Sequence, residues 1–76
     1  MIERYITLAR IDDAKRFVDL AVGQPFEIDL VSGRYTVNGK SIMGVFSLDL
    51  ASPILMQATC DEHDGFMEKV RDFLAE

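Results

Sequence analysis

The sequence predicts an α+β fold, an open-faced β-sandwich in which helices cover one face of a four-stranded antiparallel sheet. Short segments with alternating apolar and polar residues indicate half-buried strands, and two longer segments with apolar residues every three or four positions indicate helices. The resulting order is β-α-β-β-α-β-α. Because 76 residues suffice for one small core only, we expect a single domain over residues 1–76.

A strand and a long helix are predicted first. The strand covers residues 2–9, and its inward side chains are Ile2, Ile6 and Leu8. The helix follows, with a buried stripe of Ala14, Phe17, Val18 and Ala21. We expect Asp12 or Asp13 to cap the start of this helix, and Gly23 and Pro25 to end it.

A hairpin is predicted next. Residues 26–30 alternate, with Phe26, Ile28 and Leu30 on one side, and residues 35–37 form a short third strand. The pair Ser32-Gly33 between them indicates a tight turn.

The last part of the chain supplies a short helix, a strand and a final helix. Ser41 is the expected N-cap of a helix over residues 42–50. A fourth strand covers residues 54–59, begins after Pro53, and has as inward side chains Ile54, Met56 and Ala58. Asp61 then caps a second long helix, whose buried stripe is Phe66, Val70, Phe73 and Leu74, with Met67 beside it.

Composition and charge limit the classes of function. Thirteen acidic against eight basic residues give a net charge of -5, so we expect neither a nucleic-acid partner nor a membrane partner. One cysteine, Cys60, and one histidine, His63, exclude an internal disulfide and a Cys-rich or His-rich metal site. We expect no metal and no cofactor. The first residues lack the apolar region of a signal peptide, and we expect a cytoplasmic protein.

One segment carries most of the functional information. Residues 37–48, VNGKSIMGVFSL, resemble the regulatory-serine segment of the HPr family, the histidine-containing phosphocarrier proteins of the bacterial sugar phosphotransferase system. Phe17-Val18 matches the first helix of that family, and Cys60-Asp61-Glu62 matches the start of its last helix. The resemblance covers nearly the whole chain and implies an HPr-like fold and a role in bacterial carbohydrate metabolism.

The phosphoryl-carrying motif of the family is missing. The resemblance places Arg10 where the family has its phosphorylated histidine, and it places Asp12 and Asp13 where the family has an arginine and a proline. A guanidinium group stays protonated and is no phosphoryl acceptor. Two carboxylates at a helix start would also repel a phosphate from the backbone N–H groups there. We therefore predict neither an enzyme nor a phosphocarrier.

The helix after Ser41 is the predicted docking surface. Val45 and Leu48 are expected to point inward. The remaining apolar side chains, Ile42, Met43 and Phe46, would form an exposed patch for partner proteins, with Lys40 beside it. The resemblance also implies that a dedicated protein kinase phosphorylates Ser41, a modification that a helix N-terminus tolerates well.

The predicted function is thus that of a non-catalytic regulatory or adaptor protein, a monomer or a weak homodimer. Two alternatives stay open. The first is a residual phosphocarrier, in which His63 would have to replace the missing histidine despite its acidic neighbours. The second is a self-associating or small-molecule-binding module without a signalling role. Cys60 is expected to pack as a small hydrophobic side chain, with a reactive thiol as the alternative.

Overall fold

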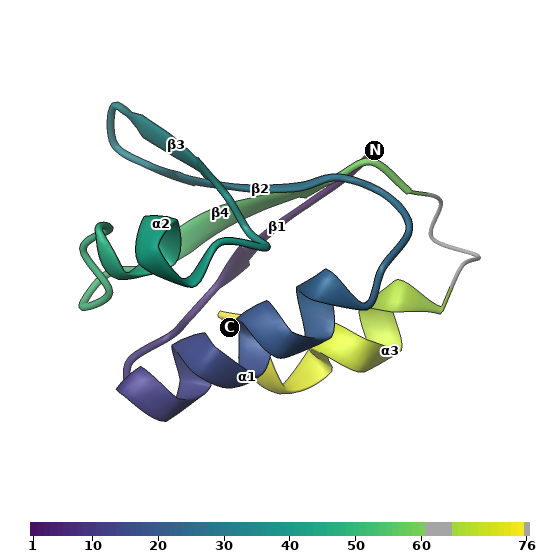
Figure 1. The fold of residues 1–76 in the computed structure, drawn as a ribbon, viewed down its shortest axis with the longest axis horizontal. Coiled ribbons are helices and arrows are strands. Elements are labelled where there is room, and N and C mark those ends of the chain that lie inside the picture. The colour runs from purple at the N-terminus through teal and green to yellow at the C-terminus, as the bar shows by residue number, and fades with distance from the viewer. Residues whose placement is uncertain (61–64, 76) are drawn as a thin grey trace.

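Four antiparallel strands form a single sheet in the order β1-β4-β2-β3, and the helices lie on one side of it (Figure 1). The structure is a computed structural model that describes residues 1–60 and 65–75. The strands are β1 (Ile2–Ile6), β2 (Ile28–Ser32), β3 (Tyr35–Asn38) and β4 (Ile54–Ala58). The helices are α1 (Ile11–Val22), α2 (Ile42–Phe46) and α3 (Phe66–Val70), and a 3₁₀ helix at Arg71–Phe73 follows α3. This confirms the predicted fold class and element order.

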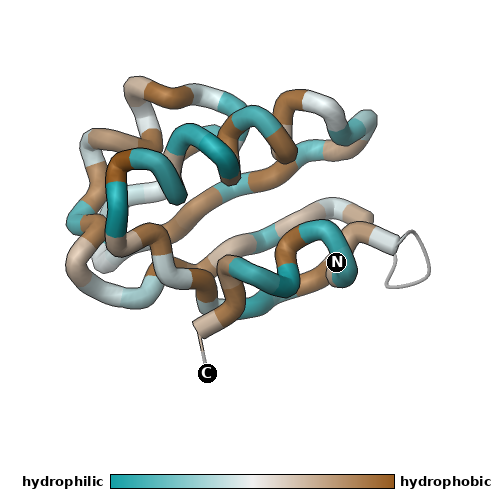
Figure 2. Tube along the Cα trace, turned by 90° about the horizontal axis from the view of Figure 1, so that it is seen from below, coloured by the Kyte–Doolittle hydropathy of each residue, from teal (hydrophilic) through white to brown (hydrophobic). Residues whose placement is uncertain are grey.

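One hydrophobic cluster fills the space between the sheet and the helices. The predicted inward residues of the strands, apart from the half-buried Phe26, and the stripe of α1 are buried in it, and teal and brown segments alternate along the chain accordingly (Figure 2). Two edge-to-face aromatic pairs join α1 and the following loop to the last helical part. Phe17 lies 5.5 Å from Phe73 and Phe26 lies 5.1 Å from Phe66, measured between ring centroids.

All four strands differ from their predicted bounds, and β3 extends one residue further than predicted, to Asn38. β1 ends at Ile6, although Leu8 beyond it is buried as predicted, and β4 ends at Ala58. β2 begins at Ile28, so Phe26 precedes the strand and is half-buried against α3. Alternation predicts which side chain points inward, but it does not show where the backbone ladder begins or ends.

The cap predicted for α1 was wrong. Arg10 is the N-cap, with φ -116° and ψ 152°, and its side chain makes no capping hydrogen bond. Its carbonyl accepts a hydrogen bond from the Ala14 N–H at 3.2 Å. Asp12 and Asp13 lie in the first helical turn instead, where the helix dipole favours acidic side chains. Aspartate is favourable at both places, so the sequence pattern did not distinguish them.

α2 is also shorter than predicted, because it ends at Phe46 and not at Leu50. Ser47 closes it: its N–H and its Oγ both donate to the Gly44 carbonyl, at 3.1 and 2.6 Å. Asp49 Oδ1 then accepts from the Ala51 N–H at 3.0 Å, which turns the chain toward β4. Val45 and Leu48 are buried, as predicted.

The final helix is short in the part of the chain that the structure describes. α3 begins after Gly65, whose φ of 77° suits glycine, and the predicted cap Asp61 lies outside the described residues. Leu74 leaves the helical stretch and pairs with Ile6, and the Ala75 N–H donates to the Tyr5 carbonyl at 2.9 Å. The prediction of a second long helix was therefore wrong, because the chain leaves the helical conformation at Leu74 and continues along the edge of β1.

A close backbone approach connects β2 with the chain that enters α2. The buried Gly39 donates its N–H to the Ile28 carbonyl at 2.7 Å. A Cβ atom on Gly39 would lie 2.9 Å from Ile28 Cγ2 and 3.1 Å from the Ile28 carbonyl oxygen. Only glycine fits there without a shift of β2 or of the turn. This contact fixes where α2 starts.

Gly39→Ala tests this contact. We expect it to lower the free energy of unfolding by about 1–3 kcal/mol, because the added methyl group overpacks against β2. Gly23→Ala is the matched control: its Cβ would meet only the Leu20 carbonyl, at 3.5 Å, with φ -76°. The control should be neutral or stabilising by up to about 1 kcal/mol. Urea unfolding of both variants measures the difference, and equal effects would contradict the role of Gly39.

Candidate functional site

Ser41 caps α2, as predicted. Its backbone is extended, with φ -108° and ψ 112°, and its Oγ accepts a hydrogen bond from the Gly44 N–H at 3.1 Å. The Ser41 N–H donates to the Asn38 carbonyl at 3.0 Å, which ties the cap to the end of β3. The hydroxyl is thus held at the start of the helix, on a half-buried residue.

Lys40, predicted to contact partners, makes an internal contact between α2 and α1. Its Nζ donates to the Gln24 carbonyl at 2.8 Å, and Gln24 in turn donates through Nε2 to the Leu20 carbonyl at 3.0 Å. The ammonium group therefore lies just beyond the end of α1, a helix that has no basic residue in its last turn. A cation is favourable at that end of a helix. A binding role for Lys40 stays a prediction.

The apolar residues of α2 are only partly exposed. Met43 is 77% exposed and Phe46 is 38% exposed, whereas Ile42 is half-buried and packs against the core. The prediction that Ile42 belongs to an exposed patch was therefore wrong. The first residue of this five-residue helix already packs against the hydrophobic core. We call Met43 and Phe46, together with the adjacent Ser41, the α2 surface.

The N-terminal half of α1 lies beneath α2 (Figure 1) and adds an apolar side chain that sequence reasoning missed. Ile11, the first residue of α1, is 64% exposed. The signal in the sequence was an isoleucine directly before two aspartates, where helix periodicity gives no inward assignment. A large aliphatic residue at the first position of a helix, outside the buried stripe, was thus the sequence signal for this exposed side chain.

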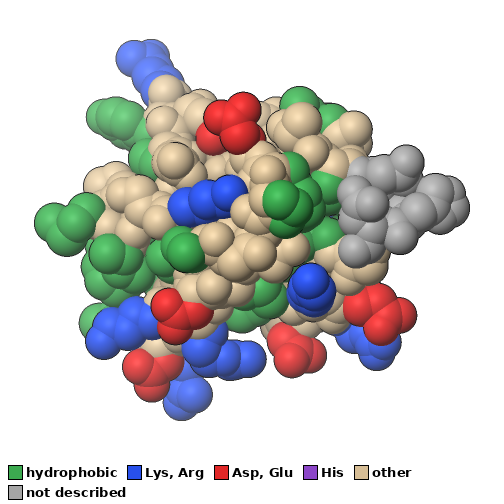
Figure 3. All heavy atoms as spheres, turned by 45° about the vertical axis from the view of Figure 1, so that its right-hand side comes forward, with side chains coloured by type: hydrophobic (Ala, Val, Ile, Leu, Met, Phe, Trp, Pro, Cys, Tyr) green, Lys and Arg blue, Asp and Glu red, His purple; other side chains and the backbone are tan. Residues whose placement is uncertain are grey.

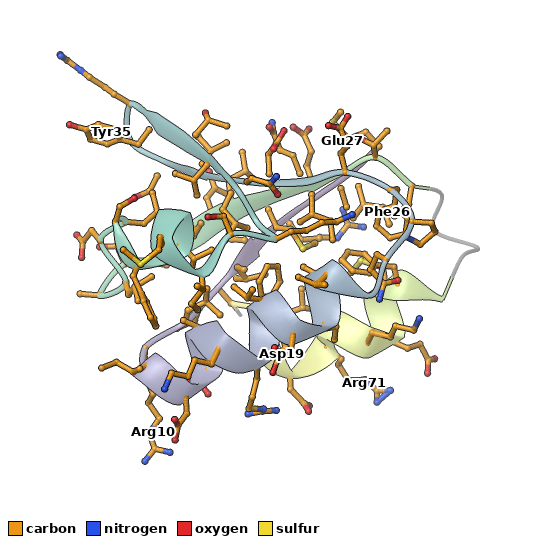
Figure 4. The ribbon with its side chains drawn as sticks, viewed as in Figure 1. Arg10, Asp19, Phe26, Glu27, Tyr35 and Arg71 are labelled. Atoms are coloured by element: carbon orange, nitrogen blue, oxygen red, sulfur yellow. The ribbon has the colours of Figure 1, made fainter. Side chains whose placement is uncertain are left out.

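Arg10 stands at the N-terminus of α1, where the resemblance placed the phosphorylated histidine. Its side chain is exposed and extends away from the helix (Figure 4). Asp13 in the same turn lies 3.6 Å from Arg16, measured from Oδ1 to the guanidinium nitrogen, as an i,i+3 ion pair. A guanidinium and two carboxylates provide no phosphoryl acceptor of the histidine type. His63 lies outside the described residues.

The described residues bring together no group of three or more His, Cys, Asp or Glu side chains suited to a metal ion. Among the helices of that same part of the chain, none has the length and apolar character to cross a membrane. Acidic and basic side chains are interspersed on the side of the molecule that carries α1 and α3 (Figure 3).

Comparison with solved structures shows which fold the chain has. No protein-family model matches the sequence, and no curated protein is a significant match to it. Among solved structures, the crystal structure of HPr-C-His from Thermoanaerobacter tengcongensis matches with a TM-score of 0.75 and 25% sequence identity. The match covers 95% of this chain and 89% of that one. The chain therefore has the HPr-like fold that the sequence predicted.

Ser41→Ala measures the contribution of the cap. We expect the variant to lose about 1 kcal/mol of the free energy of unfolding, because the Gly44 N–H loses its acceptor. Ser52→Ala, in the exposed loop before β4, should change it by less than about 0.5 kcal/mol. Chemical denaturation of the two variants is the measurement, and a Ser41→Ala variant as stable as the control would contradict the capping role.

Proposed function

We propose that this HPr-like chain is a non-catalytic regulatory or adaptor protein, related to the phosphocarriers of the sugar phosphotransferase system. It binds partner proteins through the α2 surface, and phosphorylation of Ser41 controls that binding. The observation that carries this proposal is the combination of a capped, outward-facing α2 with a non-histidine N-terminus on α1.

Exposure of Met43 supports docking. A methionine with three-quarters of its surface in water has no packing role in the monomer, and its flexible thioether adapts to varied partner surfaces. Phe46, three residues later on the same short helix, adds an aromatic ring of the kind enriched at interface centres. Two such side chains on one turn of helix form a small anchor, which suits a transient interaction better than a permanent one.

Control through Ser41 follows from the geometry of the cap. A phosphoryl group on Oγ would add about -1.5 to -2 charges beside the exposed Met43 while staying at the favourable end of the helix. The modification would thus change the charge of the docking surface without requiring a new fold. A partner with an apolar anchor site would lose affinity, and a partner with a basic rim would gain it.

A residual phosphocarrier is the weaker alternative. The charge-bearing group at Arg10 is a guanidinium, and the first turn of α1 carries two acidic side chains. Both features oppose phosphoryl transfer at that position. Self-association through the same α2 surface is the second alternative, because exposed Met43 and Phe46 would also serve a symmetric contact.

Incubation with the serine kinase that modifies HPr proteins, together with ATP, tests the proposal. We expect one added phosphoryl group in the intact mass, lost in Ser41→Ala. Met43→Asp should slow the modification about tenfold or more, since loss of about 1.4 kcal/mol of docking free energy corresponds to a factor of ten. Val22→Asp, at a position on α1 that is 59% exposed, is the matched control and should react normally.

An unchanged mass, with an authentic HPr modified in the same experiment, would contradict control through Ser41. Equal rates for Met43→Asp and the wild type would contradict docking of the kinase on the α2 surface. Sedimentation of the wild type and Met43→Asp separates the remaining alternative: a dimer that dissociates only in Met43→Asp would show that the surface serves self-association.

A further inference from the structure

The face of the sheet turned away from the helices carries two ordered rows of side chains. Strand register places the members of each row directly opposite one another across all four strands. The first row consists of Tyr5, Leu55, Val31 and Thr36, and the second of Glu3, Gln57, Asp29 and Asn38. Most alternate residues of the same strands enter the core, whereas Arg4 and Tyr35 in that set are exposed.

The first row is apolar apart from one threonine. Tyr5 is 58% exposed, and Leu55 and Val31 at the centre of the row are half-buried by their neighbours alone. None of the helices that the structure describes covers this face (Figure 1). The three apolar side chains therefore form a continuous strip across β1, β4 and β2. A contiguous exposed apolar strip is typical of a docking surface. The charge of the side chains next to the strip determines which kind of partner fits.

The second row is acidic. Glu3 and Asp29 flank Gln57, which donates through Nε2 to Glu3 Oε2 at 2.7 Å. Glu27, next to β2, also points away from the helices (Figure 4). Of the strand residues on this face, none is lysine or arginine. The apolar strip is thus bordered on one side by the carboxylates of Glu3 and Asp29, and Arg4, the neighbour of Glu3 in β1, donates from its guanidinium to the Glu3 carbonyl at 2.9 Å.

We propose that this open face is a second docking surface, separate from the α2 surface, for a protein segment that sets apolar side chains beside lysines or arginines. Charge selects this occupant. A second copy stacked on this face would present no lysine or arginine from its own strand residues there, so it would leave Glu3 and Asp29 without a basic partner from that face. A basic and apolar segment satisfies both rows at once.

The spacing of the rows suits a short amphipathic helix. Adjacent strands lie about 4.8 Å apart, so each row spans about 14 Å, and residues i and i+2 of one strand lie about 7 Å apart. A helix rises about 1.5 Å per residue, so nine or ten residues, roughly, cover one row. Its apolar side chains at i, i+3 and i+7 would lie along the strip, and its basic flank would reach the acidic row.

The test uses a helix-forming peptide with a leucine stripe flanked by lysines, and a matched peptide with glutamates in place of the lysines. We expect the lysine peptide to bind the wild-type protein, as measured by fluorescence anisotropy, and the glutamate peptide to bind at least tenfold more weakly. Amide chemical shifts should change around Leu55 and Val31.

Leu55→Glu is the decisive variant. This substitution removes the centre of the apolar strip and adds a negative charge. If lysines were attracted merely to an acidic protein, the added charge would make binding tighter. We expect instead that binding weakens about tenfold. Tyr5→Ser, at an exposed position, gives the same direction of change if Leu55→Glu folds poorly. Asp29→Lys should also weaken binding, and Met43→Asp should leave it unchanged.

Three results would overturn the proposal: no measurable binding of the lysine peptide, equal binding of the two peptides, or undiminished binding to both Leu55→Glu and Tyr5→Ser. Loss of binding in Met43→Asp would assign the peptide to the α2 surface instead. Because the readout does not depend on Ser41 or on a kinase, failure here leaves the proposed function of the α2 surface to its own test.

Discussion

Burial of only one face of the sheet is the constraint on which the rest of this structure depends. With 76 residues the chain supplies a single core, and the alternating strands place that core beneath one face. The helices must then gather on that side, where α1 fills the centre and α2 covers the region near β3. The opposite face stays open, so its cross-strand rows are available for contact. Both candidate surfaces of the molecule therefore follow from the same asymmetry.

Residues 39 and 40, directly before the α2 cap, contact partners that lie far from them in the sequence. Gly39 fits against Ile28 because it has no side chain, and Lys40 reaches the end of α1. These two contacts come immediately before Ser41, so the cap begins at a fixed point relative to both layers. The helix has only five residues, so few of its side chains reach the solvent: Val45 is buried and Met43 is exposed.

Alternation and helical spacing were sufficient to predict the element order, the inward residues of β1 and β4, Ile28 and Leu30 in β2, and the stripe of α1, because these depend on side-chain periodicity alone. Helix ends were not predictable in the same way. Arg10 caps α1 through its backbone conformation and not its side chain, and Ser47 ends α2 by a hydrogen bond back to Gly44. The half-burial of Ile42 and the rows on the open face required the tertiary register, which one sequence does not contain.

The two helix starts differ in a fold shared with HPr. α2 keeps a serine cap and an outward methionine, while α1 begins with Arg10 and two acidic residues. The most direct measurement is incubation with labelled phosphoenolpyruvate and the enzyme that phosphorylates HPr, with an authentic histidine-containing HPr as positive control. We expect the control to acquire acid-labile label and this protein to acquire none. Stoichiometric acid-labile label on this protein would contradict this expectation.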